Sequence, residues 1–127
     1  IGQYSTILGN GGVVYAISNS GQNGKMISVE ETSQNWFDAK TWCSNYGTGW
    51  YLPSLDELKV IYNNKSAINS ILSANGCTSL GTGSYWSSTV FSNNKLSGVY
   101  VLGFSSGKTS SIYETSDTFT VRAVLAF

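Results

Sequence analysis

The sequence predicts an α+β fold in which two or three helices pack on curled antiparallel sheets. Strand-like runs come first, helical spacings occupy the middle of the chain, and a longer series of strand-like runs follows. Strands and helices that are segregated along a chain are typical of this class. The 127 residues are enough for one domain with a buried core and too few for two ordinary ones, so we assign residues 1–127 to a single domain.

The first strand-like runs predict a hairpin. Residues 12–17 and 25–29 are rich in Val, Ile, Met and Tyr, which favour strands, and residues 19–24 between them contain only Asn, Ser, Gly and Gln. Two such runs around a turn-rich segment are typical of a β-hairpin.

Helical spacing begins near residue 35. Apolar side chains recur at intervals of three and four at Trp36, Ala39, Cys43 and Tyr46, which predicts a helix over about 35–46 with Gly47 as its stop. A further short helix is predicted over 66–74, where Ile68, Ile71 and Leu72 mark one face and an Asn-Gly pair follows.

The central helix has the most explicit start signal. Pro53 lacks a backbone donor and favours extended backbone at Leu52. Ser54, followed three residues later by Glu57, is a capping box, in which the hydroxyl and the carboxylate each accept a free amide of the first turn. Leu55, Leu58, Ile61 and Tyr62 then mark one helical face.

The last part of the chain reads as strands separated by polar turns. Residues 105–107, Ser-Ser-Gly, are a candidate tight hairpin turn. The predicted strands are 85–90, 98–104, 108–113 and 119–125, and they suggest an antiparallel meander.

Four motifs in a fixed order resemble those of one bacterial surface-domain family. They are Trp36-x-x-Ala39-x-x-x-Cys43, Gly49-Trp50-Tyr51-Leu52-Pro53-Ser54-x-x-Glu57-Leu58, Tyr85-Trp86-Ser87-Ser88-Thr89 and Val121-Arg122-Ala123-Val124. Together they span about residues 25 to 127 and resemble the collagen-like adhesin C-terminal (Lcl C-terminal) domain family. The resemblance implies a C-type-lectin-like fold, related in shape to formylglycine-generating enzymes, and an extracellular binding or adhesion role. Tyr51 replaces the Arg common in the family, so the role of that Arg is not carried over.

The tryptophans can be interpreted in two ways. Trp36, Trp50 and Trp86 lie inside regular apolar patterns, which favours a shared aromatic core over a sugar-stacking platform. We expect one contiguous buried cluster, made of Trp50, Leu52, Leu58, Ile61 and Trp86.

The two cysteines leave several alternatives open. Cys43 and Cys77 do not have the spacing of a metal or redox motif, so they could form a disulfide, remain as buried thiols, or include a reactive nucleophile. An exported domain allows the disulfide, whereas the family motif needs only Cys43.

Composition argues against several function classes. Seven basic and seven acidic residues give a formal net charge of zero, which disfavours nucleic acid and anionic membranes as partners. No apolar run is long enough to insert into a membrane, and the sequence shows no signal segment. The start at Ile1 suggests a fragment of a longer exported protein, with its export signal in residues that are not shown.

Catalysis and metal binding have little support in the residues. The chain contains no His, which removes His-activated nucleophiles and imidazole metal sites. The acids lie at a helix start, in turns or on a polar helix face, and the sugar-binding calcium signatures of C-type lectins are missing. We therefore expect no enzyme activity, no catalytic residues, no metal and no cofactor.

Two functions remain. The first is a non-catalytic extracellular recognition or adhesion module of a bacterial cell surface that binds a glycan or protein through two loops. The candidate ligand-binding residues are Phe91, Asn93, Asn94, Lys95, Tyr113, Glu114 and Asp117. The alternative is a structural domain of a surface or fimbria-like assembly with no ligand of its own. The sequence leaves the oligomeric state open.

Arg122 is the only arginine and lies in an apolar run. A charge there is costly without a partner, so we expect a structural role in which Arg122 pairs with Glu57 or, failing that, Asp56. The planar guanidinium suits such a position better than a lysine ammonium would.

Overall fold

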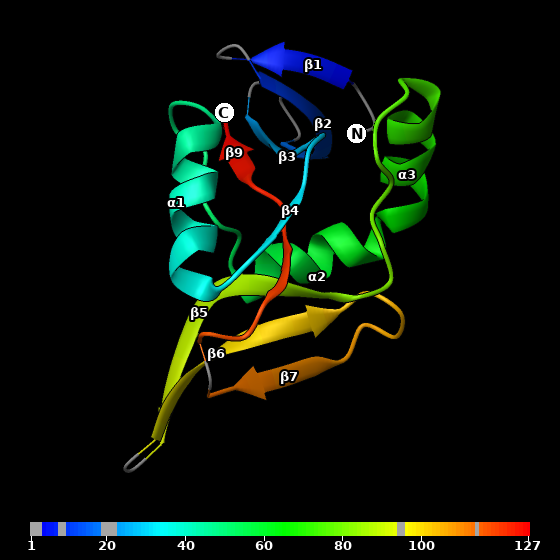
Figure 1. Ribbon diagram of the computed structural model, residues 1–127. Coiled ribbons are helices and arrows are strands. Elements are labelled where there is room, and N and C mark those ends of the chain that lie inside the picture. The colour runs from blue at the N-terminus through cyan, green and yellow to red at the C-terminus, as the bar shows by residue number, and fades with distance from the viewer. Residues whose placement is uncertain (1–3, 8–9, 19–22, 94–95, 114) are drawn as a thin grey trace.

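Two sheets and three helices make up the part of the chain that the computed structural model describes, residues 4–7, 10–18, 23–93, 96–113 and 115–127. The predicted α+β class is confirmed (Figure 1). The helices are α1 (Trp36–Tyr46), α2 (Leu55–Asn63) and α3 (Lys65–Ala74). The strands are β1 (Tyr4–Ile7), β2 (Asn10–Ile17), β3 (Gly24–Ser28), β4 (Thr32–Gln34), β5 (Ser84–Asn93), β6 (Leu96–Gly103), β7 (Thr109–Ile112), β8 (Phe119–Val121) and β9 (Val124–Ala126).

The first sheet contains four antiparallel strands in the order β1-β2-β3-β9. β2 and β3 are the hairpin predicted from residues 12–17 and 25–29. β9 pairs with β3, so the last strand of the chain lies beside this early hairpin. β1 was not predicted, because a run of four residues is too short to show a periodic apolar pattern.

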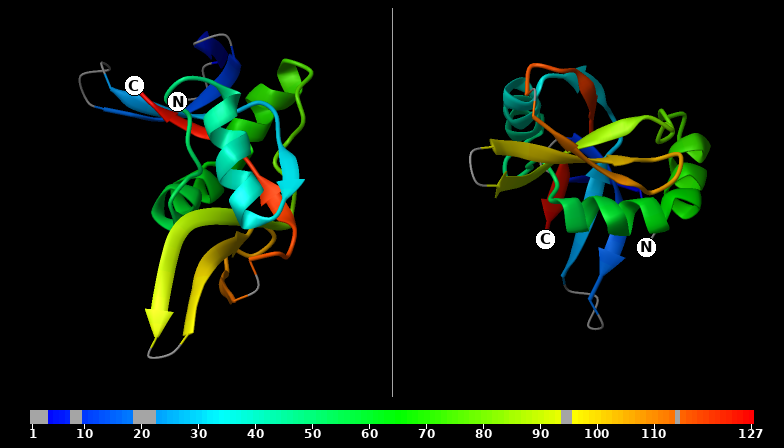
Figure 2. Two further views of the ribbon diagram at one scale, coloured as in Figure 1. Left: turned by 60° about the vertical axis from the view of Figure 1, so that its left-hand side comes forward. Right: turned by 90° about the horizontal axis from the view of Figure 1, so that it is seen from below.

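The second sheet contains five strands in the order β4-β8-β5-β6-β7. β5, β6 and β7 form the predicted meander, and the turn between β6 and β7 contains Gly107 at a φ of 76°. β8 lies parallel to β5 at the pair Tyr85↔Thr120, so this sheet is mixed rather than purely antiparallel. The β5–β6 hairpin projects away from the rest of the fold (Figure 2).

The prediction of one strand over 119–125 is wrong. β8 and β9 belong to different sheets, and Arg122 and Ala123 connect them. The Ala123 amide donates to the hydroxyl of Ser28 at 3.0 Å, and the Arg122 guanidinium donates to the carbonyl of the same residue. The chain therefore leaves the second sheet after β8 and enters the first at β9, a change of sheet that an apolar pattern alone does not reveal.

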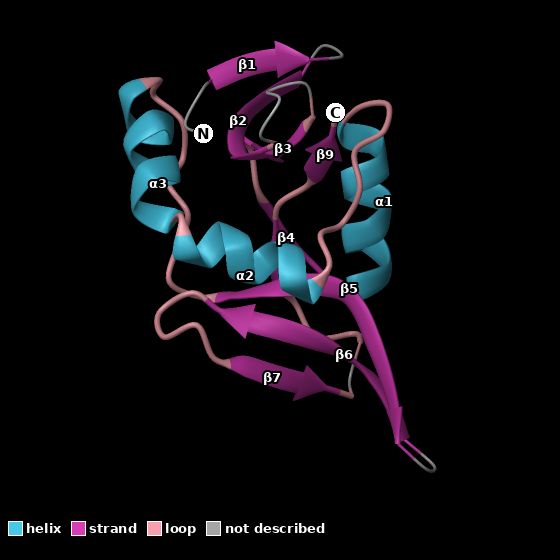
Figure 3. Cartoon of the chain, turned by 180° about the vertical axis from the view of Figure 1, so that it is seen from behind, coloured by secondary structure: helices cyan, strands magenta, loops and turns pink. Residues whose placement is uncertain are grey.

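The helices begin where the sequence places them. Ser54 accepts from the Glu57 amide at 3.1 Å, and the Glu57 carboxylate accepts from the Ser54 amide at 2.8 Å, so the capping box is confirmed. α1 ends at Gly47 as predicted, but Gly47 has a φ of 172°, which is extended backbone, and the left-handed conformation occurs at Gly49 instead. α2 lies between the two sheets, with α1 and α3 on either side (Figure 3).

The buried side chains form two clusters rather than the single cluster predicted. Trp50, Leu52 and Trp86 are buried in the first, between α1 and the sheets. Leu58 and Ile61 are buried in the second, because α2 turns them toward α3 and the strands β5 and β6. All five residues are therefore core residues, as expected, but they are divided between the two sides of the fold. Pro53 is also buried, next to Leu52.

Arg122 is buried and ion-paired, but with a different partner from the one predicted. Its Nη2 lies 2.8 Å from Oε1 of Glu31, and its Nε donates to the same oxygen at 2.9 Å. Glu57 instead accepts from Lys25 Nζ at 2.7 Å and from the Tyr51 hydroxyl. The pairing with Glu57 or Asp56 is therefore wrong, because the first turn of α2 faces β3 and Tyr51 rather than Arg122.

The two cysteines are free thiols in the structure. Cys43 is buried in the first cluster, whereas Cys77 is half-buried beside the second, so no disulfide joins them. Burial raises the pKa of the Cys43 thiol to about 12, which agrees with a packing role for this side chain. Of the helices in the described residues, none has the length and apolar character needed to cross a membrane.

Candidate ligand-binding groove

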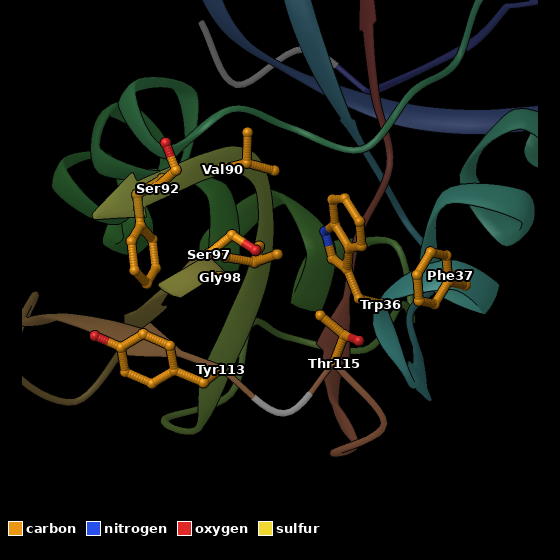
Figure 4. A pocket seen from close by; sticks show the side chains of 10 residues that line it. Trp36, Phe37, Val90, Ser92, Ser97, Gly98, Tyr113 and Thr115 are labelled. Carbon is orange, nitrogen blue, oxygen red and sulfur yellow. The ribbon is translucent and has the colours of Figure 1, made fainter. Parts of the chain in front are cut away.

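An open groove of about 520 Å³ lies where the start of α1, the β5–β6 hairpin and the segment after β7 meet (Figure 4). Its volume is within the range of about 300–1,000 Å³ that is usual for small-ligand sites. The residues that line it are Trp36, Phe37, Val90, Phe91, Ser92, Ser97, Gly98, Val99, Tyr113 and Thr115. We call this site the aromatic groove.

Large apolar side chains at the groove are unusually exposed. The exposed fractions are 58% for Phe37, 60% for Val90 and 51% for Tyr113, and these three residues come from three different segments of the chain. An exposed apolar residue on its own is ordinary, but several that converge on one concave surface are typical of an interaction site.

The start of α1 fixes one wall of the groove. Asn35 caps the helix by accepting from the Asp38 amide at 2.9 Å. The next residue, Trp36, donates its indole N–H to the carbonyl of Ser87 at 2.9 Å, and its backbone amide donates to the carbonyl of Thr115 at 3.1 Å. These bonds tie the helix start to β5 and to the segment after β7, so the wall is held in place before any ligand arrives.

The β5–β6 hairpin supplies the opposite wall. Phe91 pairs across the hairpin with Gly98, and its ring lies so close to Gly98 that an added Cβ would meet ring carbon at 2.6 Å. The Phe91 ring also contacts those of Tyr100 and Tyr113, at centroid distances of 4.9 Å and 5.4 Å. A side chain at residue 98 would displace the Phe91 ring, so glycine is required there. The Phe91 ring in turn connects the hairpin to Tyr113.

The described residues that line the groove are uncharged. Aromatic faces alternate with the hydroxyls of Ser92, Ser97, Thr115 and Tyr113, and no carboxylate or ammonium group is among the described lining residues. Beside the groove, the Nζ atom of Lys40 lies 3.9 Å from the centre of the Trp36 ring. Such a surface can cover apolar groups of a ligand and exchange hydrogen bonds with it.

Two of the predicted ligand-binding residues line this groove. Phe91 and Tyr113 do, although Phe91 lies in strand β5 and not in a loop as predicted. Asp117 is exposed but does not line it. Asn93 is the last residue of β5, and its side chain lies outside the described part of the structure. The predictions for Asn94, Lys95 and Glu114 fall on residues outside the described ranges.

Several groove residues were missed or misassigned. Trp36 was predicted as core, but it is half-buried and presents part of its ring to the groove. Phe37 and Val90 could have been recognised from the sequence. Each is a large apolar residue outside the inward-facing apolar pattern of its own element, which indicates an exposed apolar side chain. Ser97, Gly98 and Thr115 carry no such signal, because only the pairing of distant strands makes them neighbours.

The Glu57 carboxylate lies outside the groove and is already hydrogen-bonded within the fold. Burial acts to raise the pKa of Glu57, but hydrogen bonds from Lys25, the Ser54 amide and Tyr51 outweigh burial and hold that pKa below its usual value. Tyr51 in turn has a raised pKa, through burial and its bond to Glu57. In the described ranges, no three Cys, Asp or Glu side chains are grouped in a way that could hold a metal ion.

Comparison of the whole chain with models of known protein families and with curated proteins gives no match. The resemblance to the collagen-like adhesin family therefore rests on the four motifs quoted above.

Proposed function

We propose that this chain is a non-catalytic recognition module that binds its ligand in the aromatic groove. The convergence of Phe37, Val90 and Tyr113 on one concavity is the observation that carries the proposal. Their side chains contribute little to the buried core, and exposed apolar surface is a liability unless a partner covers it. Aromatic rings beside small hydroxyl residues are also the mixture found at protein binding surfaces, where the rings supply area and the hydroxyls supply adaptable hydrogen bonds.

We further propose that the module is an extracellular domain of a bacterial surface protein with a C-type-lectin-like fold. The support is the set of four family-like motifs, which fall on central elements: the α1 face, the α2 start, the beginning of β5, and the β8–β9 connection that contains Arg122. A composition with 11% charged residues and many hydroxyls and amides agrees with an exported domain. The groove, in this proposal, is the adhesive surface.

The proposal is tested by ligand screening with matched variants. The protein is screened on a glycan array and against a displayed library of linear peptides, and each binder is then measured with Phe37→Ala and Tyr113→Ala. Both side chains are more than half exposed, so these variants should fold normally while binding falls by roughly tenfold or more. Val60→Ala is the control, because Val60 is also exposed but lies on α2 outside the groove.

Two outcomes would overturn the proposed function. One is a binder whose affinity is unchanged by Phe37→Ala and Tyr113→Ala. The other is the absence of any binder, which would favour a structural domain of a surface assembly. Catalytic turnover that is lost on changing a single carboxylate would contradict the non-catalytic assignment.

A further inference from the structure

The outer half of β5 has a free strand edge beside the aromatic groove. Backbone groups alternate sides along a strand, and the hydrogen bonds at the end of β6 fix that alternation. The Gly103 amide donates to Lys108 O on the β7 side, whereas the next amide, that of Phe104, donates to Gly83 O on the β5 side. By the same alternation, Gly98 faces β5.

The register across the hairpin then sets the direction of the β5 backbone. Phe91 is paired with Gly98, so its amide and carbonyl face β6. The backbone groups of its neighbours, Val90 and Ser92, therefore face outward, away from β6.

No strand covers this outward edge in the described part of the molecule. β8 reaches β5 only at Tyr85↔Thr120, and the Ser88 amide donates to Pro53 O at 2.8 Å. Beyond that point, the outward backbone groups of Val90 and Ser92 have no hydrogen-bond partner among the described residues. Unpaired donors and acceptors along a strand edge are a template for another strand.

One face of this part of the hairpin contributes to the groove next to the edge. Val90 is paired with Val99 and Ser92 with Ser97, so these four side chains share that face, and all four line the groove. Phe91 and Gly98 alternate with them and line the groove from the other face. Trp36 lies across from Val90, Ser92, Ser97 and Val99, and Phe37 lies on the far side of Trp36 (Figure 4). A strand placed along the edge would direct every second side chain onto this face.

We propose that the ligand is an extended segment of a partner protein, which adds as a strand to β5 at Val90–Ser92 and places alternate apolar side chains in the aromatic groove. This inference rests on the proposed function and names the class of its ligand. Main-chain bonds to the edge supply affinity, and the groove supplies specificity. The described lining residues, which are aromatic, aliphatic or hydroxyl-bearing, favour apolar or hydroxyl side chains at the inward positions.

The unpaired backbone groups of β5 favour a peptide over a glycan as the ligand of the groove. A peptide strand presents amides and carbonyls at the spacing of the free groups on Val90 and Ser92, whereas a sugar has no such repeat. Aromatic stacking alone would fit either ligand, so the backbone edge is the deciding observation.

The first experiment locates the binding edge. Peptides are selected from a displayed library of linear sequences, and amide hydrogen exchange is measured by NMR on the wild-type protein with and without the best peptide. The amides of Val90 and Ser92 should become protected by roughly tenfold or more, and selected sequences should carry apolar residues at alternate positions. A bound peptide that leaves both amides unprotected would overturn the inference.

The second experiment removes one donor from the edge. Ser92→Pro deletes an outward amide that has no partner within the hairpin, and proline is tolerated at such edge positions. Ser92→Ala is the matched control, because it loses the hydroxyl and keeps the amide. Peptide affinity should fall roughly tenfold further in Ser92→Pro than in Ser92→Ala, and equal affinities would contradict strand addition. If near-ultraviolet circular dichroism shows that Ser92→Pro is misfolded, the amide exchange experiment on the wild-type protein decides.

Other occupants have distinct signatures. An uncharged oligosaccharide whose binding is lost in Phe37→Ala, but is equal in Ser92→Pro and Ser92→Ala, would overturn the strand inference and leave the proposed function intact. Concentration-dependent dimers in sedimentation equilibrium, lost in Ser92→Pro, would assign the edge to a second copy of the chain and overturn the partner peptide. Binding unaffected by any groove variant would overturn both proposals.

Discussion

Replacing Arg122 with lysine should destabilise the protein strongly, because the guanidinium joins three segments of the chain. It is paired with Glu31, which follows β3. Its Nη1 donates to the carbonyls of Ser28 and Val29 at 2.8 and 3.1 Å, and its Nη2 donates to Thr78 O at 2.6 Å. The side chain itself is fully buried.

The expected loss of stability follows from the hydrogen bonds that a lysine at this position cannot make. A single ammonium nitrogen can retain Glu31, but it cannot spread its donors over the positions of three separate carbonyls. At least two carbonyls should then lose their donor, at about 1–2 kcal/mol each, because the bonds to Val29 and Thr78 are only part-buried. We expect Arg122→Lys to lower the free energy of unfolding by about 2–4 kcal/mol, a large share of the roughly 5–15 kcal/mol of an ordinary domain.

Urea unfolding followed by tryptophan fluorescence measures this change. Lys59→Met is the control, because Lys59 is exposed on α2 and its loss should alter stability by no more than about 0.5 kcal/mol. The free energy of unfolding of Arg122→Lys could instead lie within about 0.5 kcal/mol of the wild-type value, with the same dependence on urea concentration. That result would show that the guanidinium does not hold the three segments together.

Three further outcomes are expected. Gly98→Ala should lower the melting temperature, because the new Cβ would collide with backbone and with the Phe91 ring, and an unchanged melting curve would refute this. Alkylation of the native protein should modify Cys77 and spare Cys43, and denaturation should make both cysteines reactive. A mass spectrum without reductant that shows a disulfide between them would contradict the free thiols. Glu57→Gln should flatten the acid dependence of stability: the folded pKa of Glu57 lies below the unfolded value of about 4.3, so its contribution is full above that value and is lost as pH falls through the folded pKa. Equal acid dependence in wild type and variant would rule this out.

The fold class and helix starts could be predicted because their causes are local. The capping box at Ser54 and Glu57 lies within four residues, and the apolar spacing of α1 lies within three turns. The break between β8 and β9 could not be predicted in the same way. It depends on carbonyls of Ser28, Val29 and Thr78, which are distant from Arg122 in sequence.

The partner of Arg122 shows the same limit at a single residue. The sequence correctly indicates that a lone arginine in an apolar run needs a buried acceptor. Which carboxylate supplies it depends on the direction in which α2 presents its first turn, and that turn faces Lys25 and Tyr51. Residue chemistry therefore predicted the need for a pair, and only the topology identifies Glu31.

Part of the aromatic groove could be recognised from the sequence. Phe91 and Tyr113 could be predicted because each lies near the end of a strand-like run, where binding residues are often found. Phe37 and Val90 break the inward pattern of their elements, which is itself a signal. Gly98, by contrast, is a site residue only because it lies opposite the Phe91 ring, a fact of β-sheet register.

Trp36 links the fold to the site and decides which variants are informative. Part of its ring packs against the first cluster and its N–H bonds to Ser87, while another part lines the groove. Trp36→Ala would therefore remove core packing and a groove wall together, so a loss of binding in that variant could not distinguish the two causes. Phe37 and Tyr113 are more than half exposed and lack this double role, so their loss should alter ligand affinity without an equal change in stability.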